Sequence, residues 1–169
     1  MTDTITHLAK HLGKQLHQLK AQVTTAESCT GGGIAEAITR IAGSSSWFEA
    51  GYVTYSNKQK TVMLSVPNKL FDTVGAVSEE VVKAMLKGAI NKNNAQYGVA
   101  VSGVAGPSGG TERHPVGMVW FAWYNHNNDQ YTSHCAHFKG DRQSIREQTV
   151  QLALHGLIRI TQQKTPVES

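Results

Sequence analysis

The stretch that decides the fold reads Val23-Thr24-Thr25-Ala26-Glu27-Ser28-Cys29-Thr30-Gly31-Gly32-Gly33. Its first four residues are rich in β-branched side chains, which favours a β-strand. Three glycines follow, and then Ile34, Ala37 and Ile38 recur at the spacing of a helix. A strand that passes through a tight glycine turn into a helix is typical of an α/β fold, and such a turn would expose Ser28.

The rest of the chain continues this alternation. Residues 3–20 carry apolar side chains every three or four positions, which predicts an amphipathic helix. The patterns further predict a helix over 34–41, strands over 47–55, 97–102, 116–124 and 130–138, and helices over 57–64, 79–93 and 140–161. The last helix has two candidate starts, Gly140-Asp141-Arg142 or, through a capping box with Glu147, Ser144.

The order of these elements predicts the architecture. Strands that alternate with helices imply parallel crossovers, whereas Asn125-His126-Asn127-Asn128 between the last two strands is a hairpin signal. We therefore expect an α/β fold, a single three-layer α/β/α sandwich with a mixed, mostly parallel sheet, over one domain of residues 1–169.

Composition and charge narrow the class of protein. The chain has 169 residues, of which 40% are hydrophobic, and a formal net charge of +4. The Lys and Arg residues are scattered, so we expect no nucleic-acid partner, although the positive balance would help attract a small phosphorylated substrate. Two cysteines make no disulfide framework, and no segment has the apolar length of a signal peptide or of a membrane span. These features predict a cytoplasmic protein without a membrane partner.

The turn after the first strand has the features of a nucleophile site. It would expose Ser28, and the amides of the next residues at the helix N-terminus could stabilise an oxyanion. The same pattern is equally typical of a helix N-cap, with Ser28 or Thr30 as the capping residue, and both interpretations can hold at once. Cys29 is a second candidate nucleophile, because a helix N-terminus lowers a thiol pKa.

A hydroxyl nucleophile needs a base, and Lys60 in Tyr55-Ser56-Asn57-Lys58-Gln59-Lys60 is a candidate. A neutral lysine can accept the serine proton if burial or nearby charge lowers its pKa. Tyr55 ends a predicted strand, so its hydroxyl could lie at the same edge of the sheet. From the pattern alone, solvated helix lysines are the commoner interpretation of Lys58 and Lys60.

Two further segments could bind an anion. The loop Gly103-Val104-Ala105-Gly106-Pro107-Ser108-Gly109-Gly110-Thr111 follows a strand and can present backbone amides, but it lacks the Gly-Lys-Ser/Thr ending of a nucleotide triphosphate loop. Arg142, at the start of the last helix, could bind a phosphate. The alternatives are a surface turn and an exposed arginine. In a strand, His134 points away from both Cys135 and His137, so we predict no metal site there.

Several blocks, in this order, carry a resemblance to a known family: AESCTGGGIAEAIT, GSSSWFEAGYVTYSNKQK, GAVSEE, VSGVAGPSGGT, PVGMVWFAW and GDRQSIREQ. The chain closely resembles the CinA C-terminal domain family, the nicotinamide-nucleotide amidases, over about residues 8–160. It resembles the stand-alone form, because the N-terminal domain that many relatives carry is not present in this sequence.

The resemblance implies hydrolysis of nicotinamide mononucleotide to nicotinate mononucleotide and ammonia, in pyridine nucleotide salvage, with no metal and no organic cofactor. It implies a serine–lysine arrangement and, in general, a homo-oligomer, with a dimer favoured. The catalytic residues that match are Ser28, Lys60 and Tyr55. With the turn amides, the predicted substrate-binding residues are Cys29, Thr30, Gly31, Gly32, Ser102, Gly103 and Arg142.

Two alternatives to the serine amidohydrolase remain open at this point. One is a cysteine hydrolase that uses Cys29. The other is a non-enzymatic module that binds nucleotides or partner proteins through the same fold, which would bind a nucleotide without turning it over.

Overall fold

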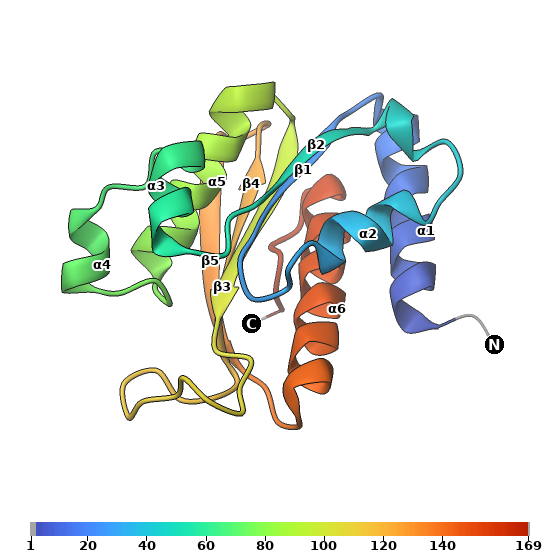
Figure 1. Cartoon of the computed structure of the whole chain (residues 1–169). Coiled ribbons are helices and arrows are strands. Elements are labelled where there is room, and N and C mark those ends of the chain that lie inside the picture. The colour runs from blue at the N-terminus through green and yellow to red at the C-terminus, as the bar shows by residue number, and fades with distance from the viewer. Residues whose placement is uncertain (1–2, 169) are drawn as a thin grey trace.

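A five-stranded mixed sheet forms the middle layer of the computed structural model, which describes residues 3–168 (Figure 1). The strands lie in the order β2-β1-β3-β4-β5, and their bounds are Phe48–Val53, Val23–Glu27, Tyr97–Gly103, Met118–Asn125 and Gln130–His137. β2, β1 and β3 are parallel, whereas β4 is antiparallel to both of its neighbours. The predicted three-layer sandwich around a mixed sheet is confirmed.

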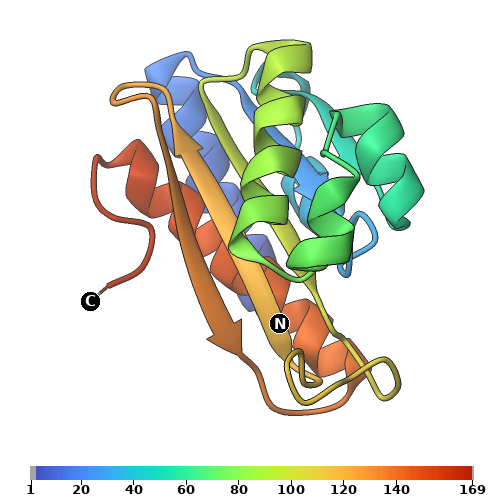
Figure 2. The same cartoon turned by 90° about the vertical axis from the view of Figure 1, so that its left-hand side faces the viewer.

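Helices cover both faces of the sheet (Figures 1 and 2). One face carries α2 and α6, and α1 packs against both of these helices. The other face carries α3, α4 and α5. The bounds are Thr4–Leu19 for α1, Gly33–Thr39 for α2, Asn57–Leu64 for α3, Lys69–Thr73 for α4, Glu79–Asn93 for α5 and Arg142–Thr161 for α6. Within residues 3–168, no helix combines the length and the apolar character that crossing a bilayer needs.

Two apolar clusters, one on each face, hold the layers together. Between the sheet and α6, the indole of Trp123 lies where a Cβ on Gly156 would overlap it, so only glycine allows this close approach. On the opposite face, Met85 and Leu86 of α5 are fully buried with Leu64 at the end of α3. These contacts fix the positions of α3 and α6, and both helices carry residues of the candidate active site described below.

The helix starts follow capping chemistry. Asp141 accepts a hydrogen bond from the Ser144 amide at 2.8 Å and caps α6, so the alternative start at Ser144 is wrong. The short elements α4 and the 3₁₀ turn Ser44–Ser46 were not predicted, because a single turn contains too few residues to show a periodicity.

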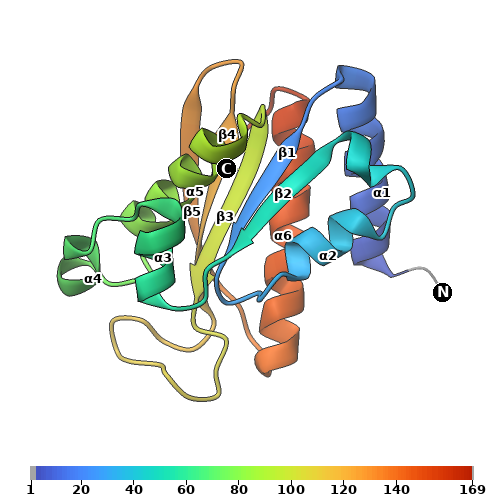
Figure 3. The same cartoon turned by 45° about the horizontal axis from the view of Figure 1, so that its top comes forward.

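The carboxyl ends of the three parallel strands meet at one edge of the sheet (Figure 3). In the register, Glu27 of β1 pairs with Val53 of β2 on one side and with Val101 of β3 on the other. α2 connects β1 to β2 on one face, and the segment with α3 to α5 connects β2 to β3 on the other. A crevice at this edge is where open α/β sheets usually bind ligands.

Candidate active site

A cavity of 260 Å³ opens at the carboxyl ends of the parallel strands. Its walls come from the turn after β1, the start of α3, the end of β3 with the loop after it, and the start of α6. The structure thereby brings together seven of the predicted site residues: Ser28, Cys29, Tyr55, Lys60, Ser102, Gly103 and Arg142. The sequence did not single out the further lining residues Asn57, Ala76 and Val77, whereas Ser108 lies in the loop that it marked as a possible anion site.

Ser28 lies on a turn that is tied to the sheet. Its amide donates to the Val101 carbonyl at 3.2 Å, and its own carbonyl accepts from the Gly31 amide at 3.0 Å. These two bonds fix the backbone on both sides of the hydroxyl. The amide of Cys29 makes no backbone hydrogen bond within residues 3–168 and is therefore available to an acceptor.

Glu27 fixes the other end of this turn, and the sequence reading missed it. Its fully buried carboxylate accepts from the Thr30 hydroxyl at 2.6 Å and from the amides of Ile34 and Ala35 at 2.8 and 3.0 Å. The N-cap of α2 is Gly32, which has no side chain to cap the helix, so Glu27 does so from the preceding strand. The sequence signal that could have identified Glu27 is an acidic residue at the end of a buried strand, shortly before a glycine turn.

Lys60 lies inside the protein rather than on its surface. Its side chain is 1% exposed, and its Nζ donates to the Tyr55 carbonyl at 3.1 Å. Burial lowers the pKa of Lys60 from 10.5 to about 8, because the charged ammonium loses its hydration. The interpretation as a solvated helix lysine is therefore wrong for Lys60, although Lys58 is exposed.

Tyr55 and Arg142 form the rim of the cavity. The Tyr55 side chain is 59% exposed, and its hydroxyl accepts from Nη2 of Arg142 at 2.9 Å. Nη1 of Arg142 donates to the Gly106 carbonyl at 2.7 Å. Tyr55 thus contacts Lys60 through its main chain, whereas its hydroxyl, which was expected at the same edge of the sheet, bonds Arg142. Arg142 bridges the end of β2 and the loop after β3.

Cys29 lines the cavity without the properties of a reactive thiol. Burial, with a smaller contribution from the Glu27 carboxylate, raises the pKa of the Cys29 thiol to about 12. The expected lowering by the helix N-terminus is wrong here, because loss of hydration outweighs the helix end. The geometry therefore favours Ser28 over Cys29 as the nucleophile.

The other turn residues lie outside the cavity lining. The Thr30 hydroxyl bonds Glu27, and its carbonyl accepts from Nη2 of Arg146 at 3.0 Å. The Gly31 amide closes the turn on Ser28, so it is not free to hold an oxyanion. Gly32 has φ +99°, a left-handed conformation that glycine adopts without strain. These three residues shape the turn that presents Ser28.

Two serines line the cavity from β3 and the loop that follows it. Ser102, which is buried, pairs with Trp120 of β4. Next to it, a Cβ on Gly103 would lie 2.6 Å from the Val119 side chain, so only glycine lets β3 and β4 pack this closely beside the cavity. Ser108 contributes a second polar residue from the loop. Within residues 3–168, no three His, Cys, Asp or Glu side chains gather closely enough to hold a metal ion.

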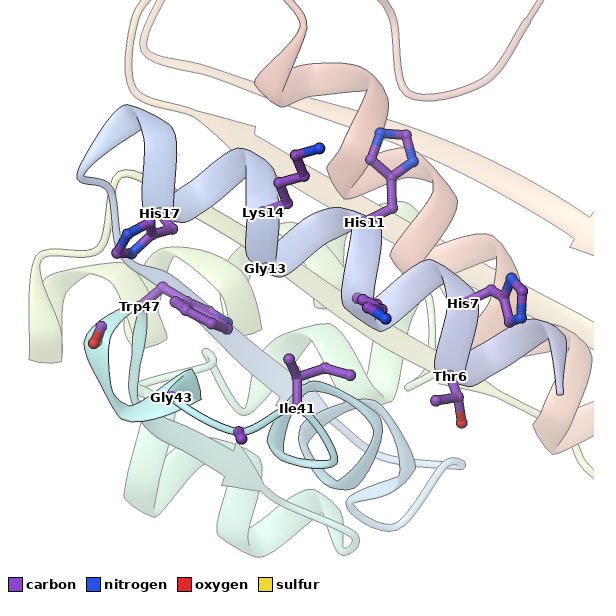
Figure 4. A pocket seen from close by; sticks show the side chains of 12 residues that line it. Thr6, His7, His11, Gly13, Lys14, His17, Ile41, Gly43 and Trp47 are labelled. Atoms are coloured by element: carbon purple, nitrogen blue, oxygen red, sulfur yellow. The ribbon is translucent and has the colours of Figure 1, made fainter. Parts of the chain in front are cut away.

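A larger groove of 790 Å³ lies elsewhere, between α1 and the segment that follows α2 (Figure 4). None of the residues that line it also lines the cavity of Ser28. It contains none of the predicted catalytic residues. The smaller cavity is therefore the candidate active site, because it holds the hydroxyl, the low-pKa lysine and the free amide.

A three-layer α/β sandwich around a mixed sheet, with a serine and a buried lysine at the ends of its parallel strands, defines the class of protein. The chain belongs to the CinA C-terminal domain family, whose model matches residues 5–161. Among its relatives, the nicotinamide-nucleotide amidohydrolase PncC of Pseudomonas putida is 60% identical over 158 residues, which is 94% of this chain and 98% of that protein. PncC of Escherichia coli K12 is 48% identical over 93% of this chain and 95% of its own length.

Solved structures agree with this assignment. The crystal structure of the competence/damage inducible protein CihA from Agrobacterium tumefaciens superposes with a TM-score of 0.89 and is 41% identical in sequence. The superposition covers 94% of this chain and 96% of that one. The fold is therefore the fold of the family throughout the matched length.

Proposed function

We propose that the protein hydrolyses the carboxamide of nicotinamide mononucleotide to nicotinate mononucleotide and ammonia, and so recycles pyridine nucleotides. The names of the PncC relatives, which match over nearly their full length, support this amidohydrolase activity on a linear amide. The observation that carries the mechanism is Lys60, a buried lysine of lowered pKa that lines the same cavity as Ser28.

In the proposed first step, neutral Lys60 accepts the proton of the Ser28 hydroxyl while Oγ attacks the carboxamide carbon. The amide of Cys29 donates to the oxyanion that forms, a contribution worth about 3–4 kcal/mol per donor in other hydrolases. The Lys60 ammonium then protonates the leaving nitrogen, and ammonia departs. This step leaves a nicotinoyl ester on Ser28.

In the second step, water attacks the ester carbon and Lys60 accepts a proton from the water. The tetrahedral intermediate collapses, the Ser28 oxygen takes the proton back, and nicotinate mononucleotide leaves. One water is consumed and one ammonia is released, so atoms and charge balance. No step uses a metal or a cofactor.

The rim of the cavity is proposed to bind the phosphate. The cavity volume of 260 Å³ lies just below the usual range of about 300–1,000 Å³ for ligand pockets, so it holds the pyridine ring and its amide, and the ribose phosphate extends to the rim. Arg142 uses one donor each for Gly106 and Tyr55 and keeps further N–H groups for an anion. Ser102 and Gly103 line the wall beside the ring.

The proposal also covers the location of the protein in the cell and its oligomeric state. We expect a cytoplasmic protein that works as a homodimer on a small-molecule substrate. Light scattering on the purified protein at micromolar concentration measures the mass of the assembly. A monomer mass at every concentration tested would contradict the dimer and leave the amidase proposal standing.

The direct test is ammonia release from nicotinamide mononucleotide by the purified protein without added metal. We expect release by the wild type and by Cys29→Ser, and none by Ser28→Ala. Circular dichroism shows whether each variant is folded. Activity that survives Ser28→Ala but not Cys29→Ser would favour the cysteine hydrolase, and binding without turnover by the wild type would favour the nucleotide-binding module.

A further inference from the structure

The larger groove has a wall of α1 on one side and the segment Ile41–Trp47 on the other (Figure 4). Thr6, Lys10, Gly13 and His17 recur along α1 at helical spacing and line it. Its 790 Å³ lies within the range of small-molecule sites. The groove is open and separate from the candidate active site, so a ligand bound in it would not be the substrate at Ser28.

Trp47 supplies a hydrogen-bond donor that has no partner. The residue is 7% exposed, and within residues 3–168 its indole N–H donates to no protein acceptor, although Nε1 itself keeps contact with solvent. Figure 4 shows the indole nitrogen turned toward the open groove. Trp123, whose indole is fully buried, differs, because its Nε1 donates to the Ala153 carbonyl at 3.1 Å. Because Nε1 of Trp47 reaches the open groove, it is available to an acceptor on a ligand bound there.

The charges around the groove have one sign. Its lining contains no Asp and no Glu, whereas the basic side chains are His7, Lys10, His11, Lys14 and His17. Figure 4 shows His17 beside Trp47, with His11 and Lys14 projecting along the outer side of α1.

Two carboxylates near the Thr6 end of the groove are already paired. Asp3 and Glu36 both bind Arg40, at 3.3 and 2.8 Å, and Arg40 also donates to the Thr6 hydroxyl. The groove therefore offers donors and positive charge with little opposing charge, which selects for an anion.

The floor of the groove is apolar. A Cβ on Gly13 would lie 2.7 Å from the Trp47 ring, so glycine lets the indole lie directly against α1. Ile41 lies on the side of the groove opposite α1 (Figure 4). The ring edge and Ile41 make an apolar surface beside the donors. A ligand that fits both parts has an apolar, planar body and an anionic group.

We infer that this groove is a second binding site, for a small aromatic anion. The aromatic body lies against Trp47 and Ile41, and the anionic group, a phosphate or a carboxylate, accepts from Nε1 of Trp47 and pairs with Lys10. The site is independent of the amidase reaction and carries no chemistry of its own.

Nuclear magnetic resonance on ¹⁵N-labelled protein tests this site directly, because each of the three tryptophans gives one indole N–H signal. The probe is 1-naphthyl phosphate, with 1-naphthoate as the carboxylate form. We expect a saturable shift of the Trp47 indole signal, assigned by its loss in Trp47→Phe, while the Trp123 signal stays in place. Neutral 1-naphthol, which lacks the anion, and inorganic phosphate, which lacks the ring, should each bind at least about tenfold more weakly.

Substitutions of lysine distinguish a specific site from a general attraction to a basic protein. Lys10→Gln should weaken 1-naphthyl phosphate binding by about tenfold, because it removes a charged partner. The matched control is Lys87→Gln on α5, across the sheet, which removes the same charge and should leave binding unchanged. Equal weakening by both variants, a Trp47 signal that moves no more than that of Trp123, or binding of 1-naphthol as tight as that of its phosphate would each overturn the proposal.

Discussion

Two lysines on one helix differ sharply in their surroundings. Lys58 and Lys60 are two residues apart on α3, yet one is exposed and the other is buried with its Nζ on the Tyr55 carbonyl. The sequence marks both as helix lysines, and no local pattern separates them. What separates them is the packing of α3 against α5, a tertiary contact that no helical periodicity records.

The pH dependence of the reaction follows from this burial. If neutral Lys60 is the base, the active fraction rises as pH rises through its pKa of about 8 and levels off above it. We expect kcat/KM for nicotinamide mononucleotide to increase about tenfold for each pH unit well below that value. Lys60→Arg, which stays charged, should be inactive throughout. A rate that is flat from about pH 6 to about pH 9 would contradict the assignment of Lys60.

At the scale of the element, α2 depends on a side chain from outside the helix. The Glu27 carboxylate binds the first amides of α2, so Glu27→Ala leaves these buried donors without acceptors. We expect the free energy of unfolding to fall by about 2–4 kcal/mol in urea titrations. We also expect kcat to fall more than KM rises, because Ser28 loses its fixed position. Glu36→Ala, on the exposed side of the same helix, is the control and should change neither value by more than a small amount.

The contact between α3 and α5 controls where Lys60 lies. A Cβ on Gly88 would overlap the Leu64 carbonyl at the end of α3, so Gly88→Ala must push the two helices apart. The expected cost is about 1–3 kcal/mol in unfolding free energy, together with a loss of more than about tenfold in kcat/KM. Lys87→Ala, one residue away and exposed, controls for the change in helix propensity. Unchanged activity in a folded Gly88→Ala protein would show that α3 does not position the base.

The sequence predicts long periodic elements and the order of the layers, and it misses features that depend on distant residues. The strand, turn and helix around Ser28 are visible because a β-branched run, three glycines and an apolar repeat lie next to one another. The role of Glu27, the partner of the Tyr55 hydroxyl and the high pKa of Cys29 are not visible. Each depends on which groups from other elements surround the residue, and the residue's own neighbours in sequence do not specify that.

At the scale of the whole molecule, the net charge of +4 should raise the rate at which the protein meets an anionic substrate. A phosphorylated substrate is attracted at low salt, and added ions screen this attraction. We expect kcat/KM for nicotinamide mononucleotide to fall by about two- to fivefold between about 20 mM and about 300 mM NaCl, with little change in kcat. A substrate of the same ring without the phosphate, nicotinamide riboside, should show a weaker dependence. If both substrates respond equally, the effect belongs to the protein's stability or assembly and not to steering.

The hydrogen bonds of Arg142 have a consequence for how the protein is made. This residue, at the start of α6, joins the Tyr55 hydroxyl to the Gly106 carbonyl across 87 and 36 positions of the chain. During synthesis, Ser28 and Lys60 leave the ribosome long before Arg142 does. The rim of the cavity is therefore closed only when translation has reached α6, so a nascent or C-terminally truncated chain has Ser28 and Lys60 without a finished cavity rim.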